Sequence, residues 1–128
     1  MNQNVTILCV DDEPINLKLF ELNFKKKYRI VTALSGMEGL TKLEEDADII
    51  VVVSDMKMPR MNGIEFIREA RQKHPHVIYF ILTGFSITPE ISEALQENII
   101  HKYFSKPLDP KLMEKAIDEA IQSYLTPL

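Results

Sequence analysis

The stretch that decides the fold is DIIVVVSDMKMPRMNG, residues 48–63, where a run of apolar, mostly β-branched residues ends on Asp55. Three other short apolar runs also lead into polar residues. They are residues 5–10 before Asp11 and Asp12, residues 77–82 before Thr83, and residues 103–105 before Lys106. Short apolar runs separated by amphipathic stretches are typical of buried parallel strands joined by crossover helices. Because the carboxyl ends of parallel strands line one crevice, we expect these polar side chains to converge there.

The pattern predicts an α/β fold in which five strands alternate with five helices. The expected strands are residues 5–10, 29–33, 48–54, 77–82 and 103–105, and the expected helices cover residues 14–26 and 63–73 and begin near Ser35, Thr88 and Asp109. The first, third and fourth strands are almost wholly apolar, as central strands are, whereas the second and fifth carry charge, as edge strands do. We therefore predict a five-stranded parallel sheet of order 2-1-3-4-5, doubly wound in the flavodoxin-like manner. Right-handed crossovers then place two helices on one face and three on the other.

Each helix should bury an apolar face against this sheet. The expected inward side chains are Ile15, Leu19, Phe20, Leu22 and Phe24 in the first helix, Met37, Leu40 and Leu43 in the second, Ile64, Ile67 and Ala70 in the third, and Leu112, Ala116, Ile117, Ala120 and Ile121 in the last. The charged residues 25–27 and 44–46 are expected to be ordinary solvated surface.

Length and composition restrict the class of protein. A chain of 128 residues fits a single domain, residues 1–128, which is either a complete protein or a segment of a longer one. Its formal net charge of −4 argues against nucleic acid or an anionic membrane as a direct partner. No apolar run approaches the length of a membrane span. Cys9 is the single cysteine and lies within a strand, so no disulfide framework is possible and a reducing, cytoplasmic environment is expected.

The polar residues at the strand ends favour phosphoryl chemistry. Two carboxylates about 4 Å apart repel by about 4 kcal/mol at an effective dielectric near 20, so an acidic cluster needs a cation. Carboxylate oxygens with open positions for water suit Mg²⁺, and Lys106 supplies a second positive charge. Asp55 is the best candidate nucleophile because it follows the most apolar strand alone. Asp11 and Asp12 are adjacent, so we expect their side chains to point in different directions, one binding metal directly and the other through water.

The ordered motifs resemble the receiver domain of two-component response regulators, the CheY-like family. The matching segments are VDDEP at residues 10–14, SDMKMPRMNG at residues 54–63, LTG at residues 82–84 and SKP at residues 105–107. Each motif alone is weak, but the set in this order is very specific, and the resemblance runs from about residue 5 to residue 124.

The resemblance implies a role for each motif residue. Asp55 is the implied phosphoacceptor. The implied Mg²⁺ ligands are Asp12 and Asp55 directly, Asp11 through water, and Lys57 through its backbone carbonyl. Thr83 and Tyr103 are the implied switch residues, Lys106 is the implied catalytic lysine, and the bond before Pro107 is implied to be a cis peptide. The implied phosphodonor is a phosphohistidine on a sensor histidine kinase or a histidine phosphotransfer domain. The implied chemistry is self-phosphorylation and autodephosphorylation, not turnover of a separate substrate.

The same resemblance implies an output surface. Thr83 and Tyr103 would bias the face made by the fourth helix, the fifth strand and the fifth helix. Tyr124 and Leu125 extend the apolar stripe of the last helix, which favours a phosphorylation-dependent homodimer. Lys57 and Phe85 flank the expected path of an attacking water. Phe85 is bulky and apolar and should crowd out that water, and a protonated lysine is not a general base, so slow hydrolysis of the acyl phosphate is predicted.

Simpler interpretations remain open at several positions. Asp11 alone could cap a helix or a turn, Tyr103 could be an edge-strand aromatic that only packs, and Lys57 could be a solvated charge. His74, His76 and His101 lack metal-ligand spacing and are expected at the surface. A dehalogenase-type phosphatase would need a second acid at position 57, where lysine stands, and a Rossmann protein would need a glycine-rich turn where DDEPIN stands. A purely structural interaction domain gives no reason to gather polar groups at the strand ends.

Overall fold

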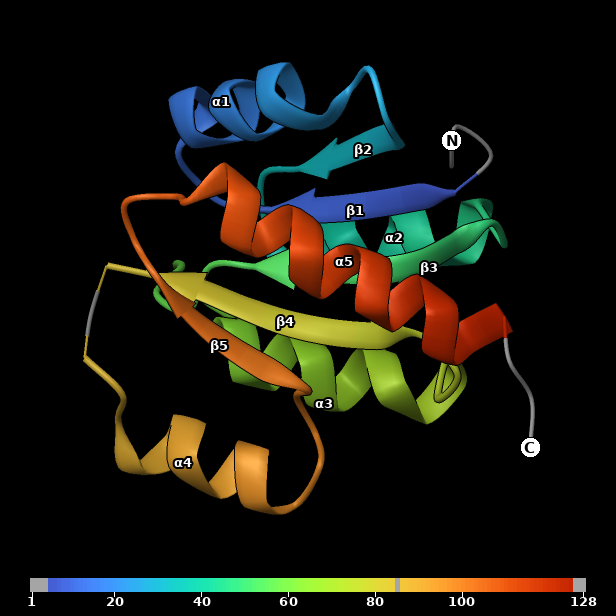
Figure 1. The fold of residues 1–128 in the computed structure, drawn as a ribbon. Coiled ribbons are helices and arrows are strands. Elements are labelled where there is room, and N and C mark those ends of the chain that lie inside the picture. The colour runs from blue at the N-terminus through green and yellow to red at the C-terminus, as the bar shows by residue number, and fades with distance from the viewer. Residues whose placement is uncertain (1–4, 85, 126–128) are drawn as a thin grey trace.

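The computed structural model describes residues 5–84 and 86–125 and has the predicted alternation of strands and helices (Figure 1). The elements are β1 (Thr6–Val10), α1 (Pro14–Phe24), β2 (Arg29–Ala33), α2 (Gly36–Glu45), β3 (Ile49–Ser54), α3 (Gly63–Lys73), β4 (Ile78–Thr83), α4 (Pro89–Gln96), β5 (Lys102–Ser105) and α5 (Pro110–Leu125). The strands form one parallel sheet in the order β2-β1-β3-β4-β5, which confirms the predicted fold.

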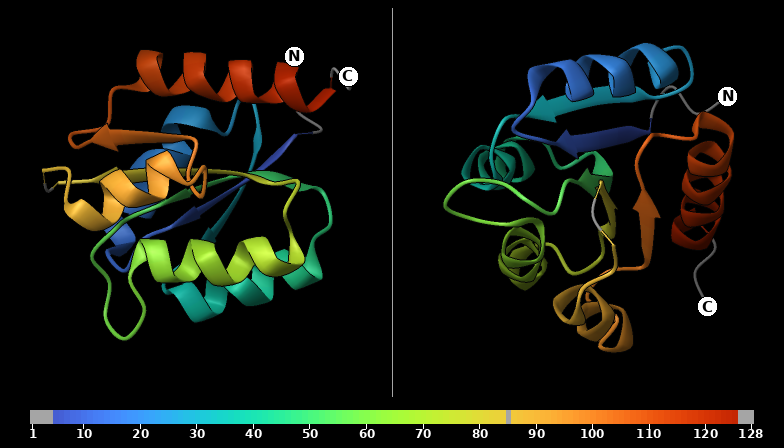
Figure 2. Two further views of the ribbon diagram at one scale, coloured as in Figure 1. Left: turned by 90° about the horizontal axis from the view of Figure 1, so that it is seen from below. Right: turned by 90° about the vertical axis from the view of Figure 1, so that its left-hand side faces the viewer.

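Helices cover both faces of the sheet (Figures 1 and 2). On one face α1 and α5 enclose an apolar cluster that contains Phe20, Phe80 and Ile117. On the other face α2, α3 and α4 enclose a second cluster, built around Phe66 and Tyr79. The central strand β3 is buried along its whole length, as its near-continuous apolar sequence requires.

Local capping explains where the helices begin. The Ser35 hydroxyl accepts a hydrogen bond from the Glu38 N–H, and the Thr88 hydroxyl accepts one from the Ile91 N–H. Pro89 occupies the first turn of α4, where its missing N–H costs nothing. At α3 the caps are reciprocal: Asn62 accepts from the backbone of Glu65, whose side chain accepts from the Asn62 N–H. These caps fix where α2, α3 and α4 begin after β2, β3 and β4.

The expected inward face of α1 was partly wrong. Phe20 and Phe24 are buried as expected, but Ile15 is 69% exposed, and Leu19 and Leu22 are each 51% exposed. At 100° per residue, residues 15, 19 and 22 lie on the side of the helix opposite to residues 17, 20 and 24. Both stripes have helical spacing, and the one that carries the two phenylalanines is buried. Met37 and Leu112 are also exposed, and Met113 is buried on α5 instead.

The charged residues that follow α1 were expected to be solvated, and this was wrong for Lys27. Its ammonium donates hydrogen bonds to Glu114 and, at 2.7 Å, to Asp118, both on α5. The buried Tyr28 donates its hydroxyl to the same Asp118 carboxylate. Burial acts to raise the pKa of Asp118, but the hydrogen bonds from Lys27 and Tyr28 outweigh it and leave that pKa below its usual value. This group fastens α5 to the turn between α1 and β2.

A second charged segment, residues 44–46, also makes ordered contacts. The Asp46 carboxylate lies 2.7 Å from the Arg29 guanidinium, and Glu44 lies 3.1 Å from the His74 ring. None of the helices in the described part of the chain combines the length and the apolar character that a membrane crossing needs.

Candidate functional site

Three carboxylates meet at the carboxyl end of the sheet. Asp11 and Asp12 follow β1 and Asp55 follows the neighbouring strand β3, and each offers an oxygen atom within 4.8 Å of the others. Asp11 and Asp55 are buried and Asp12 is half-buried. Although Asp11 and Asp12 are adjacent, both bring a carboxylate oxygen to the same cluster. Since β1 ends at Val10, the two residues lie in the following turn, where the strict alternation of a strand no longer applies.

Lys106 brings a positive charge into this cluster. Its ammonium donates to Asp11 Oδ2 at 3.0 Å and lies 3.7 Å from Asp55 Oδ1. Burial alone would lower the pKa of Lys106, but the hydrogen bond and the charge of Asp11 outweigh it and raise that pKa, so the ammonium stays charged. Burial and then the charge of Asp11 raise the pKa of Asp55. The Lys106–Pro107 peptide bond is cis.

The backbone holds Asp55 in a fixed orientation. Its Oδ1 accepts a 2.8 Å hydrogen bond from the Met56 N–H, and its own N–H donates to the Val10 carbonyl at 2.8 Å. The Ser54 hydroxyl donates to the Asp55 carbonyl. Gly63 packs so closely that a Cβ there would lie 2.2 Å from the Asp55 carbonyl oxygen. The expected site residues did not include Ser54 or Gly63. The glycine at the end of the PRMNG turn, Gly63, was the sequence signal for a close backbone approach, but its contact with Asp55 is evident only from the fold.

The remaining residues expected at the site differ in how deeply they are buried. Thr83 ends β4 and is fully buried, whereas Lys57 is exposed. Tyr103 is half-buried and packs against the cluster beneath α3 and α4. Phe85 lies outside the described residues. His101 is exposed, and its ring accepts a hydrogen bond from the Tyr79 N–H.

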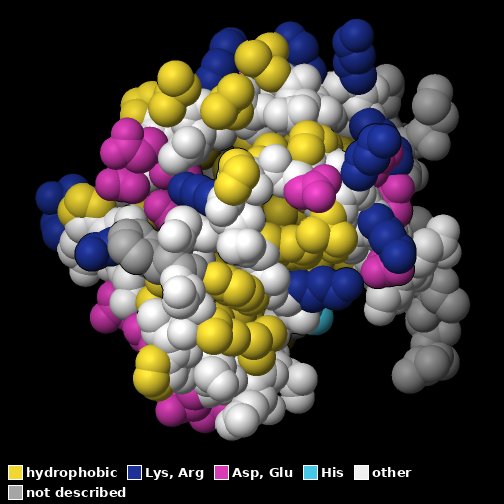
Figure 3. All heavy atoms as spheres, turned by 60° about the vertical axis from the view of Figure 1, so that its left-hand side comes forward, with side chains coloured by type: hydrophobic (Ala, Val, Ile, Leu, Met, Phe, Trp, Pro, Cys, Tyr) yellow, Lys and Arg dark blue, Asp and Glu magenta, His cyan; other side chains and the backbone are white. Residues whose placement is uncertain are grey.

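The donor set fits a hard divalent cation. All three side chains offer carboxylate oxygens, which Mg²⁺ prefers, and one of the three is half-exposed, which leaves room for bound water. Figure 3 turns this edge of the molecule toward the viewer. Acidic side chains there lie next to basic ones, with apolar side chains on both sides. The arrangement concentrates negative charge around one lysine, and an additional cation would relieve the repulsion.

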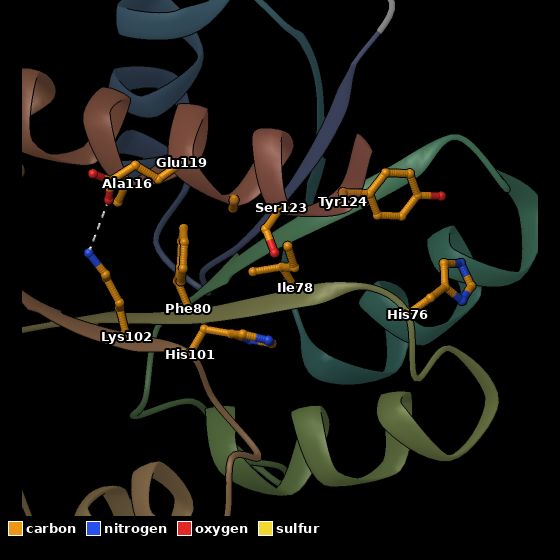
Figure 4. A pocket seen from close by; sticks show the side chains of 10 residues that line it. His76, Ile78, Phe80, His101, Lys102, Ala116, Glu119, Ser123 and Tyr124 are labelled. Atoms are coloured by element: carbon orange, nitrogen blue, oxygen red, sulfur yellow. Dashed lines mark ion pairs between the residues drawn. The ribbon is translucent and has the colours of Figure 1, made fainter. Parts of the chain in front are cut away.

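A hollow of about 740 Å³ lies at the other end of β4, against the second half of α5 (Figure 4). An ion pair between Lys102 and Glu119, 3.5 Å long, crosses one end, and His76 and Tyr124 lie at the other. The floor residues Ile78 and Phe80 are already 9% and 2% exposed, so an occupant would bury little new apolar surface. The hollow is therefore a weak candidate for a ligand site.

Known proteins have sequences similar to this chain. The family model for the response regulator receiver domain matches residues 7–118. The transcriptional regulatory protein GlrR of Escherichia coli (strain K12) is 34% identical over 117 residues, which are 91% of this chain and 26% of GlrR. The hydrogenase transcriptional regulatory protein HoxA of Cupriavidus necator is 25% identical over 95% of this chain and 25% of its own length. The chain thus spans about a quarter of the length of these curated relatives.

Solved structures lead to the same family. A response regulator receiver domain protein from Clostridium thermocellum has a TM-score of 0.83 and 31% identity, covering 93% of this chain and 95% of that one. The response regulator TrrA from Thermotoga maritima, solved in complex with Mg²⁺ and BeF, has a TM-score of 0.79 and 26% identity, covering 91% and 98%. With the family model matching most of its length, this chain belongs to the response regulator receiver domains of two-component systems.

Proposed function

We propose that Asp55 accepts a phosphoryl group from a phosphohistidine on a sensor histidine kinase or a histidine phosphotransfer domain. The observation that carries this proposal is the placement of Asp55: it is buried beside the Lys106 ammonium and within a group of carboxylates that could hold a metal ion. Its orientation is fixed by the Met56 N–H, so one oxygen is engaged and the other is available for reaction.

The transfer forms one bond and breaks one. A carboxylate oxygen of Asp55 attacks phosphorus, the phosphorus–nitrogen bond of the donor breaks, and the imidazole leaves with the electron pair of that bond. The product is an acyl phosphate on Asp55. Lys106 offsets negative charge on the phosphoryl oxygens during the transfer. Mg²⁺ would be held by Asp12 and Asp55 directly, by Asp11 through water and by the Lys57 carbonyl, and it would neutralise charge on the same oxygens.

The signal leaves through the switch residues. Two positions support this: Thr83 ends the strand next to β3, and Tyr103 lies on the edge strand β5, which is part of the proposed surface of α4, β5 and α5. Phosphorylation shifts the population between two arrangements of this surface. A phosphorylation-dependent homodimer through the same surface is the output that we propose. The modification is of the protein itself, so turnover of a separate substrate is not part of the function.

Phosphorylation can be tested without the partner kinase. The purified protein is incubated with acetyl phosphate and Mg²⁺, and intact mass is measured for the wild type and for Asp55→Asn. We expect one added phosphoryl group on the wild type and none on the variant. Omission of Mg²⁺ should suppress the reaction. Equal modification of Asp55→Asn would exclude Asp55 as the acceptor.

Dimerisation needs a separate experiment. Beryllofluoride mimics a phosphoryl group on a carboxylate, so sedimentation is measured with and without beryllofluoride and Mg²⁺. We expect a shift toward a dimer when beryllofluoride is bound. A protein that binds beryllofluoride but stays monomeric would exclude the homodimer and leave a different partner as the reader of this surface.

A further inference from the structure

The helix α4 is held to the domain by little apolar surface. It has eight residues, all of them described, and its buried side chains are Ile91 and Ala94. Its neighbour α3 has eleven residues and buries Gly63, Ile64, Phe66, Ile67 and Ala70. Leu95 adds only partial burial against the same cluster. Against this small buried surface, even modest polar contacts should measurably affect how firmly α4 is held.

Among the described residues, three polar side-chain contacts join α4 and its C-cap to α3 and its N-cap. The Arg68 guanidinium of α3 lies 3.0 Å from Glu97 Oε1 and 3.6 Å from Glu93 Oε1. The Asn62 amide, which caps α3, donates to Glu90 Oε1 at 3.4 Å. The carboxylates of α4 and its C-cap are thus held along its length by side chains of α3 and of the residue that caps α3. We call the contacts of Arg68 with Glu93 and Glu97 the α3–α4 catch.

The helix that carries this catch also packs against the phosphoacceptor. Gly63, the first residue of α3, lies against the Asp55 carbonyl, and its N–H donates to the Met56 carbonyl at 2.7 Å. The capping residue Asn62 is the next one back along the chain. A change in the backbone at Asp55 therefore reaches the N-terminus of α3 through direct contact, and α3 in turn contacts α4.

We propose that the α3–α4 catch sets how readily the domain responds to phosphorylation, by holding α4 in the arrangement of the unmodified protein. This inference rests on the proposed role of Asp55. The three side chains of the catch are between 40% and 65% exposed, so each ion pair contributes modestly and breaks easily. A modest contribution suits a regulatory contact, because loss of the catch should shift the population of the released arrangement by about threefold rather than abolish the response.

The test compares Arg68→Gln with Lys73→Gln. Both variants lose one positive charge from α3, but the exposed Lys73 lies in its last turn, away from the carboxylates of α4. Hydrogen–deuterium exchange is measured on α4 in the unphosphorylated protein. Arg68→Gln should increase α4 exchange by about threefold, and Lys73→Gln should not change it. Beryllofluoride is also titrated in Mg²⁺, with the melting temperature as the readout of binding. It should bind Arg68→Gln up to threefold more tightly than the wild type, because binding no longer has to break the catch.

The two measurements fail separately. Unchanged α4 exchange in Arg68→Gln, or an equal change in Lys73→Gln, would overturn the catch itself. Faster exchange with unaltered or weaker beryllofluoride affinity would overturn its coupling to Asp55. If the wild type bound no beryllofluoride, the proposed function would fail, while the exchange measurement would still decide whether the catch holds α4. The double variant Arg68→Glu/Glu97→Arg recreates the pair between positions 68 and 97 in reverse but leaves Glu93 next to a new negative charge. It should therefore bring α4 exchange back toward the wild-type value without reaching it, whereas Arg68→Glu alone should give no recovery.

Discussion

Replacing Lys106 by glutamine should destabilise the protein strongly when no divalent cation is present. At an effective dielectric near 20, Coulomb's law gives about 5.5 kcal/mol for the 3.0 Å pair with Asp11 and about 4.5 kcal/mol for the 3.7 Å pair with Asp55. The cost of removing these charges from water cancels much of that attraction, and loss of one partner from a buried pair typically costs about 3 to 5 kcal/mol. Because the Lys106 side chain is 24% exposed, we expect the substitution to lower the free energy of unfolding by about 3 kcal/mol, or the melting temperature by about 10 °C.

The assay is thermal unfolding in EDTA and in millimolar Mg²⁺. Mg²⁺ should stabilise Lys106→Gln more than the wild type, because no ammonium competes for the carboxylates of Asp11 and Asp55. The control is Lys102→Gln, at the start of the strand that leads to Lys106, where the exposed pair with Glu119 should contribute less than about 1 kcal/mol. If Lys106→Gln in EDTA melts within about 2 °C of the wild type, or gains no more from Mg²⁺ than the wild type does, the electrostatic account of the site is wrong.

Other substitutions test separate parts of the structure. Asp12→Ala should weaken the Mg²⁺ dependence of the melting temperature while leaving the EDTA value equal or higher, since one source of repulsion is gone. Phe20→Ala should lower the free energy of unfolding in urea by about 3 to 5 kcal/mol, whereas Leu19→Ser, on the exposed face of α1, should stay within about 0.5 kcal/mol. The folded-state pKa of Asp118 is lowered, so its contribution to stability is present above about pH 4 and disappears as pH falls through the folded pKa. The free energies of unfolding in urea of the wild type and Asp118→Asn should therefore converge at low pH. Lys57→Asn should accelerate loss of the phosphoryl group, measured by intact mass over time, because it removes an ammonium that can contact the phosphoryl oxygens. Wild-type decay within seconds would contradict the slow hydrolysis expected here.

The order of the strands was predictable because burial on two faces and burial on one face produce different sequences. The strand that ends at Ser54 is continuously apolar, whereas the edge strand of residues 29–33 begins with Arg29 and is exposed there. Convergence of Asp11 and Asp55 followed from the same order, since it makes their strands neighbours. The site was thus predictable as far as it depends on which strand ends meet.

Contacts that depend on the packing of distant segments were not predictable. Lys27 and Asp118 are 91 positions apart, and no local pattern marks them as partners. The contact of Gly63 with the Asp55 carbonyl depends on the path of the loop between β3 and α3, which composition alone does not determine. The buried face of α1 was ambiguous for a different reason. Two apolar stripes on one helix satisfy the same periodicity, and only packing against α5 and the sheet selects the stripe that contains Phe20.

The two helices of the proposed output surface are anchored very differently. The buried side chains of α5 are Met113, Ala116, Ile117, Ala120 and Ile121. The helix is also tied to the turn after α1 by Lys27 and Tyr28, through hydrogen bonds to the Asp118 carboxylate. α4 has two buried side chains and exposed ion pairs with Arg68. Elements with few buried contacts and exposed polar contacts open at the lowest free energy. If Asp55 is phosphorylated as proposed, we therefore expect α4 to move more readily than α5, and a partner that reads this surface would detect the position of α4 relative to α5.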